Sequence, residues 1–320
     1  MPPGPSRTAS LDGTRCESLI GLLDSPSRPR DASAMSLSPP LSDTADAPAP
    51  PPSLAALLAL ARPLVMGILN VTPDSFSDGG RFFDPAKAIA HAREMADDGA
   101  DILDIGAEST RPYGGAQPVA AEEEMARLAP VLREVVKVGL PVSIDTIKAK
   151  VAAWALDQGA AIVNDVWGLQ RDPDMAPLVA SRNVPVIVMH NRDEADPAID
   201  IIADMNAFFE RSLAIAERAG VRRDAIVLDP GIGFGKTPEQ SILCLARLAE
   251  FKRFGLPILV GASRKRFINW VVPSQPTERL GGSIASHLLS VEKGAAIVRV
   301  HDVKETVQAL RVAAAIEAAR

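Results

Sequence analysis

The feature that most constrains the fold of this chain is an alternation that starts at Leu64. Short runs rich in β-branched residues are followed by longer segments with helical periodicity. The eight strand-like runs are 65–70, 101–105, 141–145, 161–165, 184–189, 225–229, 257–260 and 295–300. Helical segments between them include 85–98, 122–138, 199–219, 238–253 and 279–293. Strands joined by crossover helices form a parallel sheet. Eight such units in about 250 residues predict a closed (β/α)8 TIM barrel, and a doubly wound open sheet is the alternative.

The first 52 residues do not fit this alternation. They hold eleven of the 27 prolines, with abundant Ser and Ala and little aliphatic periodicity. Such a segment buries too little apolar surface to offset its chain entropy, so we expect 1–52 to be a disordered extension and 53–320 to be the barrel domain. A translation start at Met35 or near Met66 would also account for the unusual composition of this segment. Ser53 is the expected N-cap of a short helix over 54–62.

Composition narrows the classes of function and partner. A net charge of −6, from 34 basic and 40 acidic residues, argues against a nucleic-acid-binding surface and favours small-molecule partners. No run reaches the roughly 18 apolar residues of a membrane helix, and we recognise no targeting signal. The two cysteines, Cys16 and Cys244, are too few for a disulfide framework or a Cys-based zinc site. These features predict a cytoplasmic protein with no membrane partner.

Polar side chains follow every predicted strand at its carboxyl end, where barrels carry their chemistry. They are Asn70, Asp104, Glu108, Asp145, Asn164, Asp165, His190, Asp229, Ser263, Arg264, Lys265, Arg299 and His301. Asp and Asn commonly cap the helix that follows a strand, so helix capping alone would explain any single one of them. Helix capping does not require a lysine, an arginine and two histidines at one mouth. The set therefore predicts a ligand site.

The predicted site divides by chemistry. Asp145, Asn164 and Asp229 offer acceptors and an amide that suit the N–H edge of a flat heterocycle. Cationic or donor groups suited to phosphate oxygens come from Arg111, Lys265, Arg299 and His301. Two glycine-containing loops, 72–80 and 229–236, allow close backbone approach, and the first has the composition of a closing lid. A ligand with a nitrogen-rich end and a phosphorylated end would satisfy both groups.

These residues resemble one family, the dihydropteroate synthases. The resemblance rests on seven motifs in family order over about residues 64–315: MGILNVTPDSFSDGG at 66–80, ESTRP at 108–112, SIDT at 143–146, ND at 164–165, DPGIGFGK at 229–236, SRK at 263–265 and RVH at 299–301. Short pieces such as SRK are nonspecific singly, and the ordered set is specific.

The resemblance implies a (β/α)8 barrel that joins p-aminobenzoate to (7,8-dihydropterin-6-yl)methyl diphosphate, giving 7,8-dihydropteroate and pyrophosphate. The positions matching the family's pterin-binding residues are Asp145, Asn164, Asp229 and Lys265. Those matching its diphosphate-binding residues are Thr110, Arg111, Arg299 and His301. The p-aminobenzoate region, where sulfonamides compete in this family, is matched by Thr110, Phe234 and Ser263. Asn70 matches the ligand of Mg²⁺, the implied cofactor, and a homodimer is the common assembly.

The chemistry of the residues agrees with that implied reaction. Loss of diphosphate from a CH₂ group needs charge neutralised on the leaving oxygens, which cationic side chains and Mg²⁺ provide. One Asn suffices for Mg²⁺, which shares its coordination shell with water and substrate phosphates. A carboxylate such as Asp145 favours the positive CH₂ centre. We therefore expect a dissociative path in which p-aminobenzoate attacks second, with Asp145, Lys265 and Arg111 as the catalytic residues.

Two departures from the family pattern and three competing hypotheses need a test. Tyr113 interrupts the usual Pro-Gly step, and MHNR at 189–192 replaces a more apolar sequence, so His190 either faces the pocket or is buried and structural. A corrinoid-dependent methyltransferase barrel would not need Arg299 and His301. A non-catalytic homologue would have lost motif residues. An aldolase would use Lys265 as a Schiff base, which borohydride trapping detects.

Overall fold

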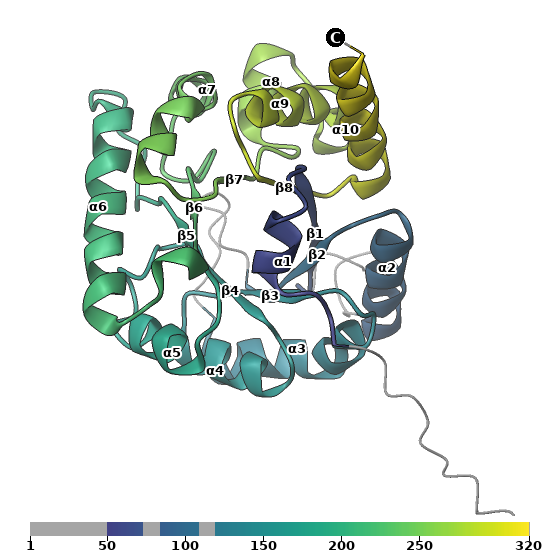
Figure 1. Ribbon diagram of the computed structural model, residues 1–320, viewed down its shortest axis with the longest axis vertical. Helices are drawn as coiled ribbons and strands as arrows, with labels where there is room; N and C mark the ends of the chain where they lie inside the picture. Colours follow the sequence, from purple (N-terminus) through teal and green to yellow (C-terminus); the bar gives the residue numbers. More distant parts are fainter. Residues whose placement is uncertain (1–49, 73–83, 109–118, 320) are drawn as a thin grey trace, which may run out of the picture. The chain divides into compact units, whose positions relative to one another are not determined.

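The computed structural model describes residues 50–72, 84–108 and 119–319. Within the unit Pro48–Arg320, eight parallel strands form one sheet in the order β6-β5-β4-β3-β2-β1-β8-β7 (Figure 1). Their bounds are β1 (Leu64–Asn70), β2 (Ile102–Gly106), β3 (Val142–Asp145), β4 (Ile162–Asp165), β5 (Val186–Met189), β6 (Ile226–Asp229), β7 (Leu259–Val260) and β8 (Ile297–Val300). A parallel bridge between Leu228 and Ile258 joins the two ends of the sheet. The predicted barrel is confirmed, and the open sheet is wrong.

Helices surround the strands (Figure 1). They are α1 (Leu54–Leu58), α2 (Pro85–Asp97), α3 (Ala121–Val136), α4 (Ala149–Asp157), α5 (Met175–Arg182), α6 (Ile201–Ala219), α7 (Pro238–Ala246), α8 (Arg266–Val271), α9 (Leu280–Glu292) and α10 (Val303–Ala318), with 3-10 turns at Arg223–Ala225, Leu248–Phe254 and Pro276–Glu278. In the described part of the chain no helix combines the length and apolar character needed to cross a bilayer.

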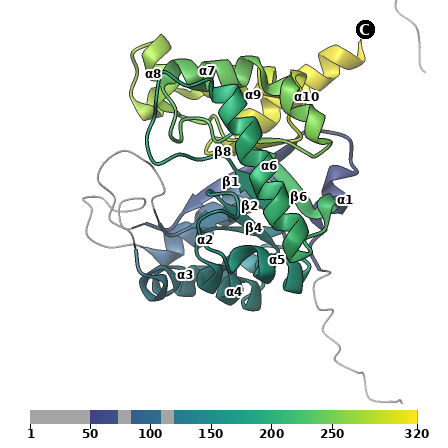
Figure 2. The same ribbon diagram turned by 90° about the vertical axis from the view of Figure 1, so that its left-hand side faces the viewer.

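The helix α1 closes one end of the barrel. Ser53 caps it as predicted, and Leu54 and Leu57 pack into a cluster with the first inward-facing residues of the strands, such as Leu64. Figure 1 shows α1 within the ring of strands, and Figure 2 shows it at one end of the barrel. The helix ends at Leu58, earlier than predicted: Ala61 has φ +52°, outside the helical region, and Pro63 disfavours helix at Arg62. The freed Arg62 side chain pairs with Asp101, 2.6 Å away.

A second boundary differs from the prediction. The helix expected over 238–253 stops at Ala246 and continues as the 3-10 turn Leu248–Phe254. Leu248, Phe251 and Phe254 are its buried residues. A spacing of three residues brings side chains onto one face at 3.0 residues per turn, so the tighter helix buries all three.

The pleat of the strands places the site. Side chains alternate along a strand, so every second residue faces the barrel interior. The innermost apolar layer contains Met66, Ile102, Ile162, Ile187, Val227, Leu259 and Ile297. Two residues further along, the same face carries Ile68, Asp104, Asn164, Met189, Asp229, Gly261 and Arg299, of which four are polar or charged. An apolar floor therefore lies directly beneath a polar layer at the carboxyl end.

Candidate active site

The polar layer opens into a pocket at the carboxyl ends of the strands. Its lining residues are Asp145, Asn164, Val166, Met189, Asp229, Gly231, Ile232, Phe234, Gly261, Lys265 and Arg299. They come from five strands and from the loops that follow β4, β6 and β7. The structure therefore brings together six of the residues predicted for the site: Asp145, Asn164, Asp229, Phe234, Lys265 and Arg299.

An ionic network connects residues of the polar layer at the base of this pocket. The Arg299 guanidinium donates from Nε to Asp104 Oδ2 at 2.6 Å and from Nη2 to Asp145 Oδ2 at 2.9 Å. Asn164 donates from Nδ2 to both oxygens of Asp104, at 3.3 and 3.2 Å. Buried charges need such pairing because their desolvation is costly. The acceptors and the cation thus interleave, whereas the sequence led us to expect them on separate sides.

The carboxylates of the pocket hold their protons more tightly than in water. Burial raises the pKa of Asp145 to about 7, against the opposing effect of the Arg299 charge. Burial likewise raises the pKa of Asp229 to about 6, although its Oδ1 accepts a 2.7 Å bond from the Gly231 N–H. Among residues 50–72, 84–108 and 119–319, Oδ1 of Asp145 and Oδ1 of Asn164 are buried without a hydrogen-bond partner. The pocket thus offers unfilled acceptors to a ligand that carries N–H donors.

One wall of the pocket is aromatic and apolar. Phe234 packs with Val166 and Met189, and the Nζ of Lys265 lies 4.0 Å from the centre of the Phe234 ring. That distance is within the range of a cation–π contact. An aryl ring would find both a flat face and a positive charge here.

The segment Ser263–Lys265 is held from outside the pocket. Arg264 has φ +57°, which is rare for a residue with a side chain. Its N–H donates to Ser283 Oγ at 2.9 Å, and its guanidinium bonds Asp302. With Arg264 held in this way, the residues on either side of it have different partners. Lys265 reaches the pocket, whereas Ser263 Oγ accepts from the His301 N–H at 3.2 Å and lies 3.0 Å from its Nδ1.

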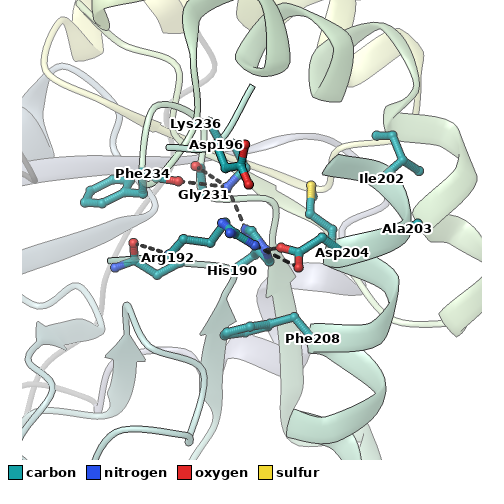
Figure 3. Close-up of polar contacts among 12 residues, drawn as sticks. His190, Arg192, Asp196, Ile202, Ala203, Asp204, Phe208, Gly231, Phe234 and Lys236 are labelled. Carbon is teal, nitrogen blue, oxygen red and sulfur yellow. Dashed lines mark hydrogen bonds and ion pairs between the residues drawn. The ribbon is translucent and has the colours of Figure 1, made fainter. Parts of the chain in front are cut away.

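His190 is buried and structural. It is fully covered, with Nε2 lying 3.0 Å from Asp204 Oδ2 and Nδ1 lying 2.7 Å from Lys236 Nζ (Figure 3). Burial first, and the neighbouring Lys236 charge second, lower its pKa to about 3, so the ring is neutral at pH 7. Of the two roles left open by the sequence, the structure places His190 beneath the loop 229–236, and not among the residues lining the pocket.

Several predicted positions are not tested by this geometry. Thr110, Arg111, Tyr113 and most of the expected lid 72–80 lie outside the described residues, as do residues 1–49 of the expected extension. Asn70 ends β1, between β2 with Asp104 and β8 with Arg299, and it is partly exposed.

Two site residues were not assigned a role from the sequence. Asp104, which is fully buried, binds both Arg299 and Asn164, and Lys236 lies beneath the loop that carries Phe234. For Asp104 a signal existed, because it is the one charged residue in the apolar run Ile102–Gly106 and lies two positions after an inward-facing Ile. For Lys236 no local pattern distinguishes a buried lysine from an exposed one.

Comparison with known proteins places the chain in one family. The family model described as pterin binding enzyme matches residues 66–301. The chain is 51% identical over 243 residues to dihydropteroate synthase of Bacillus subtilis, covering 76% of this chain and 84% of that one. The solved structure of Xanthomonas albilineans dihydropteroate synthase with 4-aminobenzoic acid superposes with a TM-score of 0.77 at 44% identity, covering 81% of this chain and 94% of that one.

The same bacterial enzyme in complex with 7,8-dihydropteroate superposes with a TM-score of 0.74 at 42% identity, covering 81% of this chain and 95% of that chain. Identities of 42–51% over most of the chain to dihydropteroate synthases favour that activity over the two competing enzyme hypotheses. The family model and the relatives match most of the chain, and the chain belongs to the dihydropteroate synthases of the pterin-binding enzyme family.

Proposed function

We propose that this chain condenses (7,8-dihydropterin-6-yl)methyl diphosphate with p-aminobenzoate in the pocket at the carboxyl end of its barrel. The products are 7,8-dihydropteroate and pyrophosphate. The observation that carries the proposal is the pairing of unfilled buried acceptors with two cations in one pocket, in a chain of this family. The roles of individual residues below are part of the proposal.

The pterin ring is assigned to Asp145, Asn164, Asp229 and Lys265. A pterin carries N–H donors along one edge, and the free Oδ1 atoms of Asp145 and Asn164 are acceptors that no group in the described residues fills. Supplying those donors removes the desolvation penalty of a buried acceptor. The second oxygen of Asp229 adds a further acceptor, since its Oδ1 is already bonded to the Gly231 N–H.

The p-aminobenzoate ring is assigned to the wall formed by Phe234, together with Ser263 and Thr110, which match the family's p-aminobenzoate region. The apolar contact with Phe234 supplies area, and the Lys265 charge above that ring attracts the electron-rich amine-bearing ring and its carboxylate. Sulfonamides share the flat aryl amine, so we expect them to compete with p-aminobenzoate here.

The diphosphate is assigned to Arg299 and His301, together with Thr110 and Arg111. Arg299 donates to the Asp104 and Asp145 carboxylates, and it lies on β8, the strand that pairs with β1. A guanidinium binds phosphate oxygens in a bidentate manner and keeps its charge at any working pH. The Nδ1 contact with Ser263 orients the His301 ring.

Magnesium fits the donor chemistry of this rim. Asn70 offers a hard amide oxygen at the end of β1, beside the strand that carries Arg299. The ranges 50–72, 84–108 and 119–319 contain no cluster of three or more His, Cys, Asp or Glu able to hold a metal by itself. Magnesium commonly uses one or two protein ligands with water and substrate phosphates. When bound, it would neutralise charge on the leaving diphosphate, with Asn70 as its protein ligand.

The residues of the pocket suit a dissociative displacement. As the C–O bond to the diphosphate breaks, positive charge develops on the CH₂ group and is shared with the dihydropterin ring. The Asp145 carboxylate, with Asp229 across the pocket, stabilises that charge. Arg299, Arg111 and Lys265 stabilise the departing anion, and the amine of p-aminobenzoate then attacks the carbon. No covalent bond to the protein is formed.

We also propose a homodimer in the cytoplasm. Large apolar side chains are exposed on α8, α9 and α10, including Trp270, Val271, Leu289 and Ile316. Of these helices, α9 and α10 pack against each other, and α8 packs against α7 (Figure 1). Large apolar side chains exposed on neighbouring helices such as α9 and α10 favour a contact with another protein surface.

Pyrophosphate release tests the proposal. The wild-type protein should release pyrophosphate from the pterin diphosphate when Mg²⁺ is present, and should form 7,8-dihydropteroate only when p-aminobenzoate is present as well. The variant Asp145→Asn, which keeps the shape and loses the charge, should lower kcat/KM by about tenfold to a hundredfold. Asp224→Asn, on the exposed surface, is the matched control.

Two results would contradict the assignment. Full activity of the double variant Asp145→Asn, Lys265→Met would show that the active site is not the pocket described here. A wild-type protein without pyrophosphate release under any of these conditions would support the hypothesis of a non-catalytic homologue.

A further inference from the structure

The loop after β6 is built around a buried ammonium group. Lys236 is 1% exposed, and its Nζ donates to the carbonyl oxygens of Gly231 and Phe234 at 2.9 and 3.1 Å. The same nitrogen lies 2.7 Å from Nδ1 of His190 (Figure 3). A lysine buried this deeply is rare unless it is paired. Burial lowers its pKa to about 8, so the group still carries its proton at neutral pH.

The contacts of Lys236 determine how the His190 ring is protonated. An ammonium group has donors and no acceptor, so His190 Nδ1 must accept. The ring proton then resides on Nε2, which donates to Asp204 Oδ2 at 3.0 Å. Asp204 belongs to α6 and also binds Arg192 at 2.9 Å. A continuous chain of charged and polar groups thus runs from α6 through the end of β5 to the β6–α7 loop.

The loop held by this chain carries two parts of the pocket. Gly231 is bonded on both sides, because its N–H donates to Asp229 Oδ1 at 2.7 Å and its carbonyl accepts from Lys236. The Phe234 carbonyl is the other acceptor of Lys236, and the Phe234 ring forms the aromatic wall. The ammonium group is therefore not part of the pocket lining, and it binds the backbone carbonyls of two residues that are.

The loop has little freedom to find another position. Gly231 and Gly235 have φ of +60° and +52°. A Cβ on Gly231 would lie 2.0 Å from the His190 carbonyl oxygen, and one on Gly235 would lie 2.4 Å from Arg192 Cβ. The loop backbone is thus pressed against the end of β5. Only glycine allows this approach, and the ammonium bonds hold the loop there.

We propose that Lys236, oriented by the His190–Asp204 pair, is a positioning residue for substrate binding: it holds Gly231 and Phe234 so that Asp229 and the Phe234 ring face the two substrates. This inference rests on the proposed function of the pocket. Lys236 does not line the pocket, and it acts through the backbone carbonyls that it binds.

The first test is the steady-state behaviour of Lys236→Met, which keeps much of the apolar stem and removes the ammonium group. We expect KM for both substrates to rise at least about tenfold, because hydrogen bonds from a charged group are lost on the loop that binds both. Asp145 and Arg299 lie on β3 and β8 and are not held by this loop, and Asp229 is the one group proposed to act on the breaking bond that is, so kcat should change less than KM. A merely structural role would lower the active fraction, and therefore the apparent kcat, with KM unchanged. Lys304→Met, at an exposed position of α10, is the matched control.

A pair of His190 variants tests the same idea without touching the lysine. His190→Asn retains an acceptor near the position of Nδ1, whereas His190→Leu retains none. We expect a raised KM for His190→Leu and a KM near wild type for His190→Asn. Equal KM values for these two variants, or an unchanged KM for Lys236→Met, would overturn the inference.

The ring nitrogens provide a direct check of the geometry. Nitrogen-15 spectra of the wild-type protein at pH 7.5 should show His190 protonated on Nε2 alone. A ring protonated on Nδ1 would overturn the donor direction. Failure of the wild-type protein to release pyrophosphate refutes the proposed function, whereas an active wild type with unaffected Lys236 and His190 variants refutes this inference alone.

Discussion

Acid should destabilise this protein partly through one buried histidine. His287 lies on α9 with 1% of its surface exposed, and in the described part of the chain neither of its ring nitrogens has a hydrogen-bond partner. Burial lowers its pKa from 6.5 to about 4, with the charge of Asp302 opposing the shift. Between pH 6.5 and about 4, His287 is protonated in the unfolded chain and neutral in the folded protein. The free energy of unfolding therefore falls as the pH is lowered through this range.

The size of the effect follows from the shift. Each pH unit below the unfolded pKa costs about 1.4 kcal/mol, so at pH 5.0 the histidine removes about 2 kcal/mol of stability relative to pH 7.5. His190, whose pKa is lowered to about 3, adds a loss of the same sign. Asp145 and Asp229 act in the opposite direction, because their raised pKa values let the folded protein bind protons first. The total slope is thus a sum of opposing contributions.

Comparison with a variant isolates the histidine. In His287→Met, urea unfolding at pH 7.5 and pH 5.0 should show an acid loss that is smaller than in the wild type by about 2 kcal/mol. His91→Met, at a half-exposed position of α2, is the matched control for loss of an imidazole. The reasoning is refuted if His287→Met loses as much stability on acidification as the wild-type protein does.

Three further substitutions test other parts of the structure. Lys148→Met removes the partner of Glu124, which is fully buried and lies 2.8 Å from the lysine; we expect a loss of about 3–5 kcal/mol in urea unfolding, and a loss under 1 kcal/mol would contradict the pairing. Gly231→Ala places a Cβ 2.0 Å from the His190 carbonyl oxygen at φ +60° and should lower Tm by several degrees, whereas an unchanged Tm would show that the loop yields easily. Thr237→Ala removes the capping box of α7 and should cost about 1 kcal/mol, with Thr237→Ser restoring it.

The sequence predicted the elements better than their ends. All eight predicted strands are present, and each boundary lies within two residues of its prediction. The errors at Leu58 and Ala246 have different causes. Pro63 disfavours helix at Arg62, a local signal that the predicted range 54–62 did not take into account. After Ala246, burial of Leu248, Phe251 and Phe254 favours a 3-10 turn, and helical periodicity alone does not show that burial.

The candidate site shows the same limit. The strand-end positions of Asp145, Asn164, Asp229 and Lys265 predicted that they would meet, and the structure brings them to one pocket. The sequence did not predict that Arg299 would lie between two carboxylates, since that contact joins residues 154 and 195 positions apart. Nor did it distinguish Lys236, a buried lysine whose partners come from two different strand ends.

By itself the sequence determined the alternation of strands and helices, the polar strand ends and the family pattern, because each is written in residues close together along the chain. Only the tertiary structure decided which charges share a floor, which histidine is buried and neutral, and which backbone atoms surround a buried ammonium. The physical reason is that burial and pairing change the free energy of a charge, and both depend on neighbours that closure of the barrel supplies.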